Sequence, residues 1–215
     1  MLRPFGLAAT ALALLIAASP VAPAADEAGF TPLFDGKTTQ GWEEIGGKPG
    51  NWRVDDGILV TEGKGGWLST ASTYADYTIR LDFRTGKAGN SGIFLRTPRQ
   101  GDPAYTGMEI QLLDDGDDQY KALKPFQYTG SIYGVVAAER GHLKPTGEWN
   151  SIEVVAEGKK IRVTLNGATI VDADLAKHPE AAASHPGILR ADGYIGLQAH
   201  SDRVEFRNIR IKTAR

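Results

Sequence analysis

Three short segments of the chain alternate polar and apolar side chains, and their polar members include groups that can transfer protons or bind hydroxyls. These segments span residues 92–96, 108–112 and 195–200. Because successive side chains of a β-strand point to opposite faces, each segment predicts a strand with one polar and one apolar face. The polar members are Arg96, Glu109, Gln111, Gln198 and His200.

These side chains suit a site for a ligand with many hydroxyl groups. A carboxylate such as Glu109 and an imidazole such as His200 can act as acid or base, and imidazole titrates near neutral pH. Glutamine amides and a guanidinium group both bind hydroxyls. Gly92 and Gly196 leave room for a ligand to approach the backbone. The same alternation is also typical of a solvated sheet face, so that reading stands beside the site hypothesis.

The elements that must position these residues are short strands separated by turns. The 26 glycines and 11 prolines among 215 residues favour many turns, and no long helical period occurs. Asn166-Gly167 predicts a tight hairpin between 161–165 and 168–171, because both turn positions need a positive φ. The pattern indicates an all-β fold, a β-sandwich of the jelly-roll type. Further strands are predicted over 77–84, 152–156, 195–199 and 204–211.

Composition and charge limit the kinds of partner. The chain has 24 Lys and Arg against 26 Asp and Glu, a net charge of −2, so no basic excess points to nucleic acid or a membrane surface. It has no cysteine, which excludes disulfides, a thiol nucleophile and a zinc–thiolate site. Long connections are expected over 114–128 and 174–189, where a sandwich often builds its site. The sequence sets no oligomeric state.

The first 24 residues are interpreted as a secretory signal peptide. Arg3 supplies the positive start, residues 7–18 form a short apolar run, and Ala22-Pro23-Ala24 supplies small residues for cleavage. The apolar run is short for a membrane span. We therefore expect one domain over residues 25–215, secreted to the periplasm or the cell exterior.

An acidic run is the candidate metal site. Asp114, Asp115 and Asp117 could supply oxygen ligands to calcium or another divalent cation. The run lacks the EF-hand spacing and its terminal glutamate, so a solvated acidic loop is the favoured interpretation. His142 and His185 lie in expected loops without metal-ligand spacing. No cofactor is required by the sequence.

Several motifs in order along the chain resemble the 3-keto-disaccharide hydrolase family. The resemblance starts at Phe30-Thr31-Pro32-Leu33-Phe34-Asp35-Gly36, continues through Asn51-Trp52-Arg53-Val54 and covers the chain to Lys212. It includes the following pieces: Asn90-Ser91-Gly92-Ile93-Phe94-Leu95-Arg96, Gly107-Met108-Glu109-Ile110-Gln111-Leu112-Leu113-Asp114, Gly147-Glu148-Trp149-Asn150, Gly196-Leu197-Gln198-Ala199-His200 and Phe206-Arg207-Asn208-Ile209. The resemblance implies a concanavalin A-like jelly roll that acts on sugars oxidised at C3.

That substrate class implies a particular chemistry. A ketone at C3 acidifies the hydrogen at C2, so a base can form an enolate and expel the glycosidic oxygen from C1; water then adds. Glu109 is the candidate base, and Arg96 or His200 the candidate for stabilising the enolate. His200 or Tyr133 is the candidate acid for the leaving group. Substrate binding is assigned to Gln111, Gln198, Tyr133, Asn90 and Trp67.

Two alternatives remain at this stage. The first is a non-catalytic glycan-binding module, because jelly rolls host both binding proteins and enzymes. The second is a calcium-dependent lectin centred on residues 114–118. Direct hydrolysis through an oxocarbenium ion is ranked below elimination, because it needs two opposed carboxylates and only Glu109 is clear.

Overall fold

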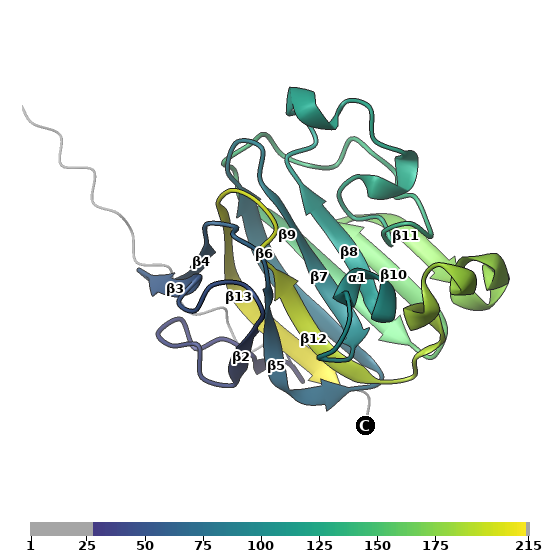
Figure 1. Cartoon of the computed structure of the whole chain (residues 1–215), viewed down its shortest axis with the longest axis horizontal. Coiled ribbons are helices and arrows are strands. Elements are labelled where there is room, and N and C mark those ends of the chain that lie inside the picture. Colours follow the sequence, from purple (N-terminus) through teal and green to yellow (C-terminus); the bar gives the residue numbers. More distant parts are fainter. Residues whose placement is uncertain (1–27, 214–215) are drawn as a thin grey trace, which may run out of the picture.

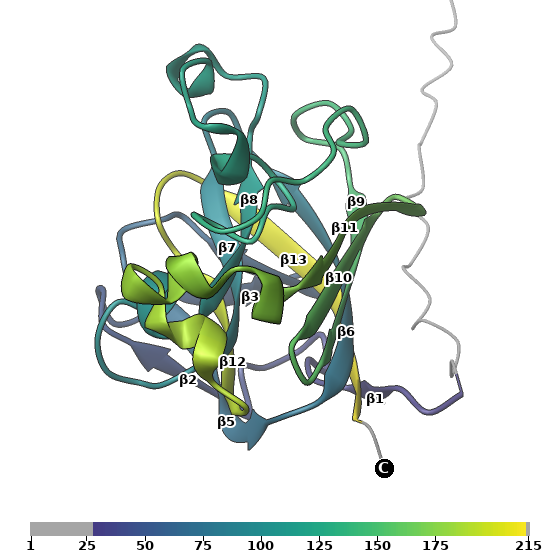
Figure 2. The same cartoon turned by 90° about the vertical axis from the view of Figure 1, so that its right-hand side faces the viewer.

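Two antiparallel β-sheets pack face to face in the computed structural model, which describes residues 28–213 (Figures 1 and 2). The signal peptide predicted over residues 1–24 lies outside the described residues. Short helices and long connections gather at one side of the sandwich, near β8, as Figure 2 shows. The all-β prediction is confirmed.

The larger sheet has eight strands, in the order β11-β10-β9-β6-β13-β4-β3, with β1 paired to β13. Every pairing in it is antiparallel. Its strands are β1 (Thr31–Pro32), β3 (Trp52–Asp55), β4 (Ile58–Thr61), β6 (Tyr77–Thr85), β9 (Asn150–Glu157), β10 (Lys160–Leu165), β11 (Ala168–Asp174) and β13 (Val204–Thr213).

The smaller sheet has five strands in the order β2-β5-β12-β7-β8. Strands distant in the sequence are therefore neighbours, since β12 lies between β5 and β7. The strands are β2 (Trp42–Ile45), β5 (Trp67–Tyr74), β7 (Asn90–Thr97), β8 (Met108–Leu113) and β12 (Gly193–Gln198).

The connections carry one short α-helix and five 3-10 helices. The two long connections expected after β8 and β11 both hold such helices. The helices are α1 (Pro103–Thr106), η1 (Asp118–Tyr120), η2 (Pro125–Gln127), η3 (Leu175–Lys177), η4 (Pro179–Ala183) and η5 (Pro186–Leu189). Within residues 28–213, none of the helices has the length and apolar character needed to cross a membrane.

The apolar rows of the strands form one core between the sheets. In β6, odd-numbered residues from Tyr77 to Thr85 are buried and the even-numbered ones are half-buried, which is the alternation that the sequence predicts. Their partners across the core include Ile93 and Leu95 of β7. The predicted hairpin is also confirmed: β10 and β11 pair through Asn166 and Gly167, both at positive φ.

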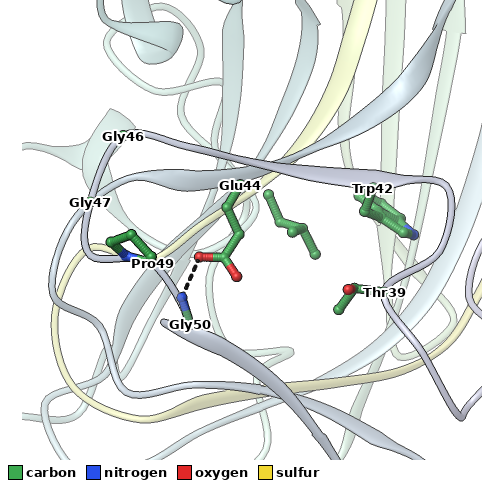
Figure 3. Close-up of a pocket in the computed structure, with 8 residues that line it drawn as sticks. Thr39, Trp42, Glu44, Gly46, Gly47, Pro49 and Gly50 are labelled. Atoms are coloured by element: carbon green, nitrogen blue, oxygen red, sulfur yellow. Dashed lines mark hydrogen bonds between the residues drawn. The ribbon is translucent and has the colours of Figure 1, made fainter.

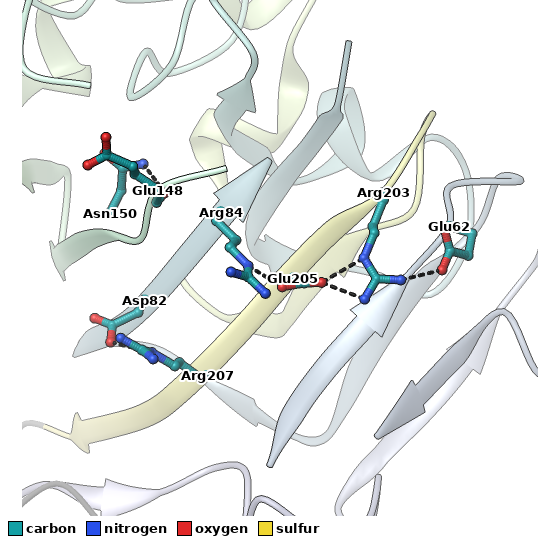
Figure 4. A network of polar contacts seen from close by, with 8 residues as sticks. All are labelled: Glu62, Asp82, Arg84, Glu148, Asn150, Arg203, Glu205 and Arg207. Atoms are coloured by element: carbon teal, nitrogen blue, oxygen red, sulfur yellow. Dashed lines mark hydrogen bonds and ion pairs between the residues drawn. The ribbon is translucent and has the colours of Figure 1, made fainter. Parts of the chain in front are cut away.

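Ion pairs cover the outer face of the larger sheet (Figure 4). Glu205 pairs with both Arg84 and Arg203, and Arg203 also reaches Glu62 at 2.8 Å. Nearby, Arg207 pairs with Asp82 at 3.1 Å. These ion pairs join β6, β13 and the residues next to β4 and β13, and they pair the charges of this outer face with one another.

Candidate functional site

The three polar segments singled out in the sequence are neighbouring strands of the smaller sheet. β12 pairs with β7, and β7 pairs with β8. In the second pairing Gly92 lies opposite Gln111, and Phe94 lies opposite Glu109. Leu197 lies opposite Ile93, which sets Gln198 beside Gly92. The adjacency on which the site hypothesis depended is therefore present for β7, β8 and β12.

The outer face of this sheet carries the polar side chains. Ile93, Ile110 and Leu197 belong to the core between the sheets. By strand alternation, Glu109 and Gln198 point the other way, out of the sandwich. This outer face is the candidate active site.

Glu109 is a buried acid without a partner. Only 3% of the residue is exposed, and its Oε1 has no hydrogen-bond partner among residues 28–213. Burial, with a smaller contribution from the charge of Asp102, raises the pKa of the Glu109 carboxyl to about 8. A buried polar atom left unpaired is costly, and strongly perturbed pKa values cluster at functional sites.

The carboxyl of Glu109 occupies the space above Gly92. A Cβ added to Gly92 would collide with Oε1 of Glu109, and the Cγ would lie 2.7 Å away. The φ of Gly92 is not in the left-handed region, so the backbone conformation does not require glycine here. The reason for a glycine is this close approach of the Glu109 side chain. The carboxyl therefore lies over β7, whose Gly92 has Gln198 of β12 on its other side.

Two amides accompany the acid. Gln198 has a buried Oε1 without a hydrogen-bond partner in the described part of the chain. Gln111 is buried, and its Oε1 accepts the backbone N–H of Leu112 at 3.1 Å, which leaves its amide NH₂ as the end to donate. These groups can bind the carbonyl or hydroxyl oxygens of a sugar.

A segment after β8 extends this face with Tyr133. The backbone N–H of Tyr133 donates to the Glu109 carbonyl at 2.8 Å, so residues 130–133 run beside β8 like a further strand. The Tyr133 hydroxyl accepts a hydrogen bond from Gln127 Nε2 at 2.9 Å. Tyr133 is half-buried, and its main chain pairs with that of Glu109; its assignment to substrate binding stays a prediction.

Two aromatic residues near Glu109 were not predicted from the sequence. The ring of Tyr105, on α1, stacks on His185 at 4.8 Å and meets the ring of Tyr133 edge-on at 6.5 Å. His185 precedes η5, which packs on α1, and Gly187 abuts Gly107. The alternation rule could not find these residues, because they come from connections and not from strands.

Arg96 does not share the outer face, and this prediction is wrong. Its φ of +50° breaks the alternation of β7. The guanidinium donates to the carbonyls of Ala75 and Gly158 at 2.8 and 2.6 Å and pairs with Asp76 at 2.9 Å. With 1% exposure, Arg96 ties the β5–β6 turn to the β9–β10 turn instead of facing Glu109.

His200 and Asn90 lie beyond the well-paired part of the face. His200 follows the end of β12, where the pairing with β7 shifts: Leu197 lies opposite Ile93, but Ser201 lies opposite Asn90. The His200 side chain is exposed. Asn90 is half-buried and its side chain contacts the hydroxyl of Tyr120, so it helps to hold the connection after β8.

Trp67 contributes packing to the same face. It is 5% exposed, lies over Gly196 and meets Phe94 edge-on at 5.7 Å. Ala104 of α1 belongs to the same small apolar cluster. Trp67 is thus covered by its neighbours on this face, and little of its ring is open for stacking on a sugar.

The acidic run holds its own loop together. Asp114 is buried and accepts from Thr146 Oγ1 at 2.6 Å and from the Ala88 N–H at 3.0 Å. Asp115 Oδ1 accepts from Thr129 Oγ1 at 2.8 Å, and burial raises the pKa of its carboxyl. Asp117 caps η1. Between residues 28 and 213, no three His, Asp or Glu side chains form a group that could hold a metal ion.

A separate hollow of about 520 Å³ lies beside β2 (Figure 3). Trp42, Leu68 and Pro49 line it together with Glu44, whose Oε2 accepts the Gly50 N–H at 3.1 Å. Glu44 is exposed. Its carboxylate is exposed and already bound to the loop, so this hollow lacks a buried acid like Glu109.

Comparison with known proteins finds one family. The family model described as "3-keto-alpha-glucoside-1,2-lyase-like domain" matches residues 29–212. A protein of Bacteroides thetaiotaomicron named 3-keto-disaccharide hydrolase is 28% identical over 229 residues, which cover 87% of this chain and 79% of the relative.

Solved structures show the same architecture. A protein of Parabacteroides distasonis named as a candidate glycosyl hydrolase superposes with a TM-score of 0.78 at 30% identity, covering 87% of this chain and 94% of that one. The β-glucanase of Bacillus licheniformis superposes with a TM-score of 0.57 at 13% identity, covering 86% and 97%. The second similarity concerns the fold alone, and it confirms the predicted jelly-roll sandwich.

Proposed function

The chain belongs to the family of 3-keto-alpha-glucoside-1,2-lyase-like domains and is a carbohydrate-active enzyme of the glycoside hydrolase or lyase type; on this premise we propose that it cleaves 3-keto glycosides, disaccharides among them, through Glu109 as base. The observation that carries the proposal is the carboxyl of Glu109, buried, unpartnered in residues 28–213 and held over Gly92.

The reaction starts at the acidic C–H bond. The Glu109 carboxylate takes the proton from C2, and the electron pair of that bond moves into the enolate of the C3 ketone. The enolate then expels the glycosidic oxygen, which breaks the C1–O bond and leaves a C1=C2 double bond. Addition of water puts a hydroxyl on C1 and a hydrogen on C2, so the net result is hydrolysis. The raised pKa makes Glu109 a stronger base than an exposed glutamate.

Neighbouring side chains can stabilise the negative charge that develops on the C3 oxygen and on the departing glycosidic oxygen. The amides of Gln111 and Gln198 are suited to bind the C3 oxygen and the neighbouring hydroxyls. Tyr133, whose main chain pairs with that of Glu109, has a hydroxyl suited to protonate the departing oxygen; the exposed His200 is the second candidate. Arg96, bound elsewhere, takes no part in this scheme.

A direct displacement would need a second carboxylate on the face. Asp102 is near enough for its charge to raise the pKa of Glu109. It is exposed, however, and its Oδ1 caps α1 by accepting the Ala104 N–H at 3.1 Å. Since Asp102 is committed to the helix, one acid with neighbouring amides favours elimination over the two-carboxylate mechanism.

The test compares wild type with Glu109→Gln on a 3-keto disaccharide and on its unoxidised parent. We expect wild type to release sugar from the keto form alone, with kcat/KM rising with pH up to about 8 as Glu109 loses its proton. The variant should lose turnover by about 10²–10⁴-fold while still binding the ligand. Solvent exchange of deuterium into C2 would report proton abstraction directly.

The controls separate the alternatives. Glu44→Gln changes an acid in the separate hollow and should leave turnover unchanged. Cleavage of the unoxidised parent would contradict the C3-ketone mechanism. Binding of both sugars without turnover would instead indicate a glycan-binding module.

We also propose that the enzyme is secreted. The support is the arginine, apolar run and small-residue site within residues 1–24. Expression with an epitope tag at the C-terminus, followed by fractionation and N-terminal sequencing, tests both export and cleavage after Ala24.

A further inference from the structure

Tyr105 is an exposed aromatic residue at the edge of the site. It is 39% exposed, and Leu189 is the other large hydrophobic side chain exposed among residues 28–213. Tyr105 lies on α1, four positions before Glu109. Burial is the main cause that raises the pKa of the Tyr105 phenol, and the charges of Tyr133, Asp102 and Glu109 raise it further. The contribution of Glu109 agrees with a hydroxyl close to the acid.

His185 fixes the orientation of this ring. The two rings stack at 4.8 Å with an interplanar angle of 26°. His185 is 7% exposed, and its Nδ1 lies 3.0 Å from Ser184 Oγ. A Cβ on Gly134 would collide with its Nε2, so the glycine makes room for the imidazole. A ring packed this closely holds Tyr105 in one place at the rim.

Different chemistry lies on the two sides of Glu109. Gln111 on β8 and Gln198 on β12 flank Gly92, so their amides lie on the side of Glu109 where its carboxyl covers that glycine. Tyr105 lies on the helix that leads into β8, and Tyr133 lies on the segment along the edge of β8 away from β7; their rings meet and form aromatic surface there. A glycoside with its C1–C2 bond at Glu109 therefore presents its two parts to different surroundings.

The oxidised sugar and the leaving group differ in what they need. The oxidised ring carries a carbonyl and hydroxyls that must be hydrogen-bonded once they leave water, which the amides satisfy. The leaving group takes part in the reaction only through its linking oxygen, so the rest of it needs contact area more than hydrogen bonds. An aromatic ring offers such area to the C–H face of a sugar or to a flat aglycone.

We infer that Tyr105 forms the subsite for the leaving group of the glycoside, with His185 as its positioning residue. This inference rests on the proposed function, because it takes Glu109 as the place where C1 and C2 bind. The leaving group that fits is a second sugar ring or another ring-shaped aglycone. A methyl aglycone would be too small to gain from Tyr105.

The experiment measures two substrates that share the oxidised sugar: a 3-keto disaccharide and the methyl 3-keto glycoside. Tyr105→Ala should lower kcat/KM about tenfold for the disaccharide and less than threefold for the methyl glycoside. His185→Ala should lower the ratio of kcat/KM for the disaccharide to kcat/KM for the methyl glycoside, as Tyr105→Ala does. His185→Phe keeps a ring on which Tyr105 can stack and should preserve this ratio. Leu189→Ala is the matched control and should leave the ratio unchanged.

Binding separates failure of this inference from failure of the proposed function. The Kd of both ligands is measured for Glu109→Gln with and without Tyr105→Ala. Selective loss of disaccharide affinity supports the subsite even if wild type turns over neither ligand, which would overturn only the proposed reaction. Equal losses for both ligands, or none, overturn the assignment of Tyr105 to the leaving group.

Discussion

The carboxyl of Glu109 lies over Gly92, its diagonal neighbour in the β7–β8 pair, and any side chain at residue 92 would occupy the same space. Because residue 92 has no side chain, the Glu109 side chain can lie flat on the sheet, away from solvent. Burial and the raised pKa of Glu109 both follow from this position. The reactivity of the acid thus depends on a residue that has no functional group.

Gly92→Ala should damage the site through this contact alone. The φ of Gly92 is not left-handed, so alanine suits the backbone, and the effect must come from the collision with Glu109. We expect a loss of about 1–3 kcal/mol in unfolding free energy and a larger relative loss in kcat than in substrate affinity. Gly116→Ala is the control, since its Cβ would meet only Asp114 Oδ1, at 3.9 Å. Equal activity of the two variants would contradict the proposed role of Gly92.

Glu109 should make the protein less stable as the pH rises. Its pKa is about 8 in the folded chain against an ordinary 4.5, so the folded state retains a proton that the unfolded state has lost. The destabilisation is absent below about pH 4.5, grows between pH 4.5 and 8, and is complete above 8 at about 3–5 kcal/mol. Urea unfolding of wild type and Glu109→Gln at pH 5, 6.5 and 8 measures it. Parallel profiles for the two proteins would show that Glu109 is not buried as described.

Alternation in the sequence predicted much of this site because its central strands are regular. Glu109, Gln111 and Gln198 share an outer face, as expected from their spacing. That their strands are neighbours could not be read from the sequence, since β12 enters between β5 and β7 from about a hundred residues further along the chain.

The rest of the site escaped prediction for local reasons. Arg96 takes a positive φ where the β7–β12 pairing shifts register, and one such residue reverses the face to which later side chains point. Tyr105 and His185 meet only because η5 packs on α1, with Gly187 against Gly107. No periodic pattern marks contacts between two connections.

Arg96 should prove a structural residue. Arg96→Ala removes the buried guanidinium that donates to Ala75 and Gly158, so the two turns lose the group that joins them; we expect a loss of about 2–4 kcal/mol. Because the guanidinium is bound away from Glu109, kcat of the folded fraction should stay within about twofold. The check is kcat/KM at a temperature where circular dichroism shows the variant folded. A large fall in kcat there, with native stability, would return Arg96 to the catalytic groups.

Asp114 should act as an internal anchor of the connection after β8. Asp114→Asn weakens acceptance from Thr146 and the Ala88 N–H, so we expect a loss of about 1–3 kcal/mol in unfolding free energy. Asp118→Asn, which changes an exposed pair with Lys121, should cost less than 1 kcal/mol. Each protein is melted with calcium and with chelator. If the Asp114 oxygens serve hydrogen bonds, the Tm of wild type is the same with calcium and with chelator. A Tm that rises with calcium in wild type but not in Asp114→Asn would make the acidic run a cation site.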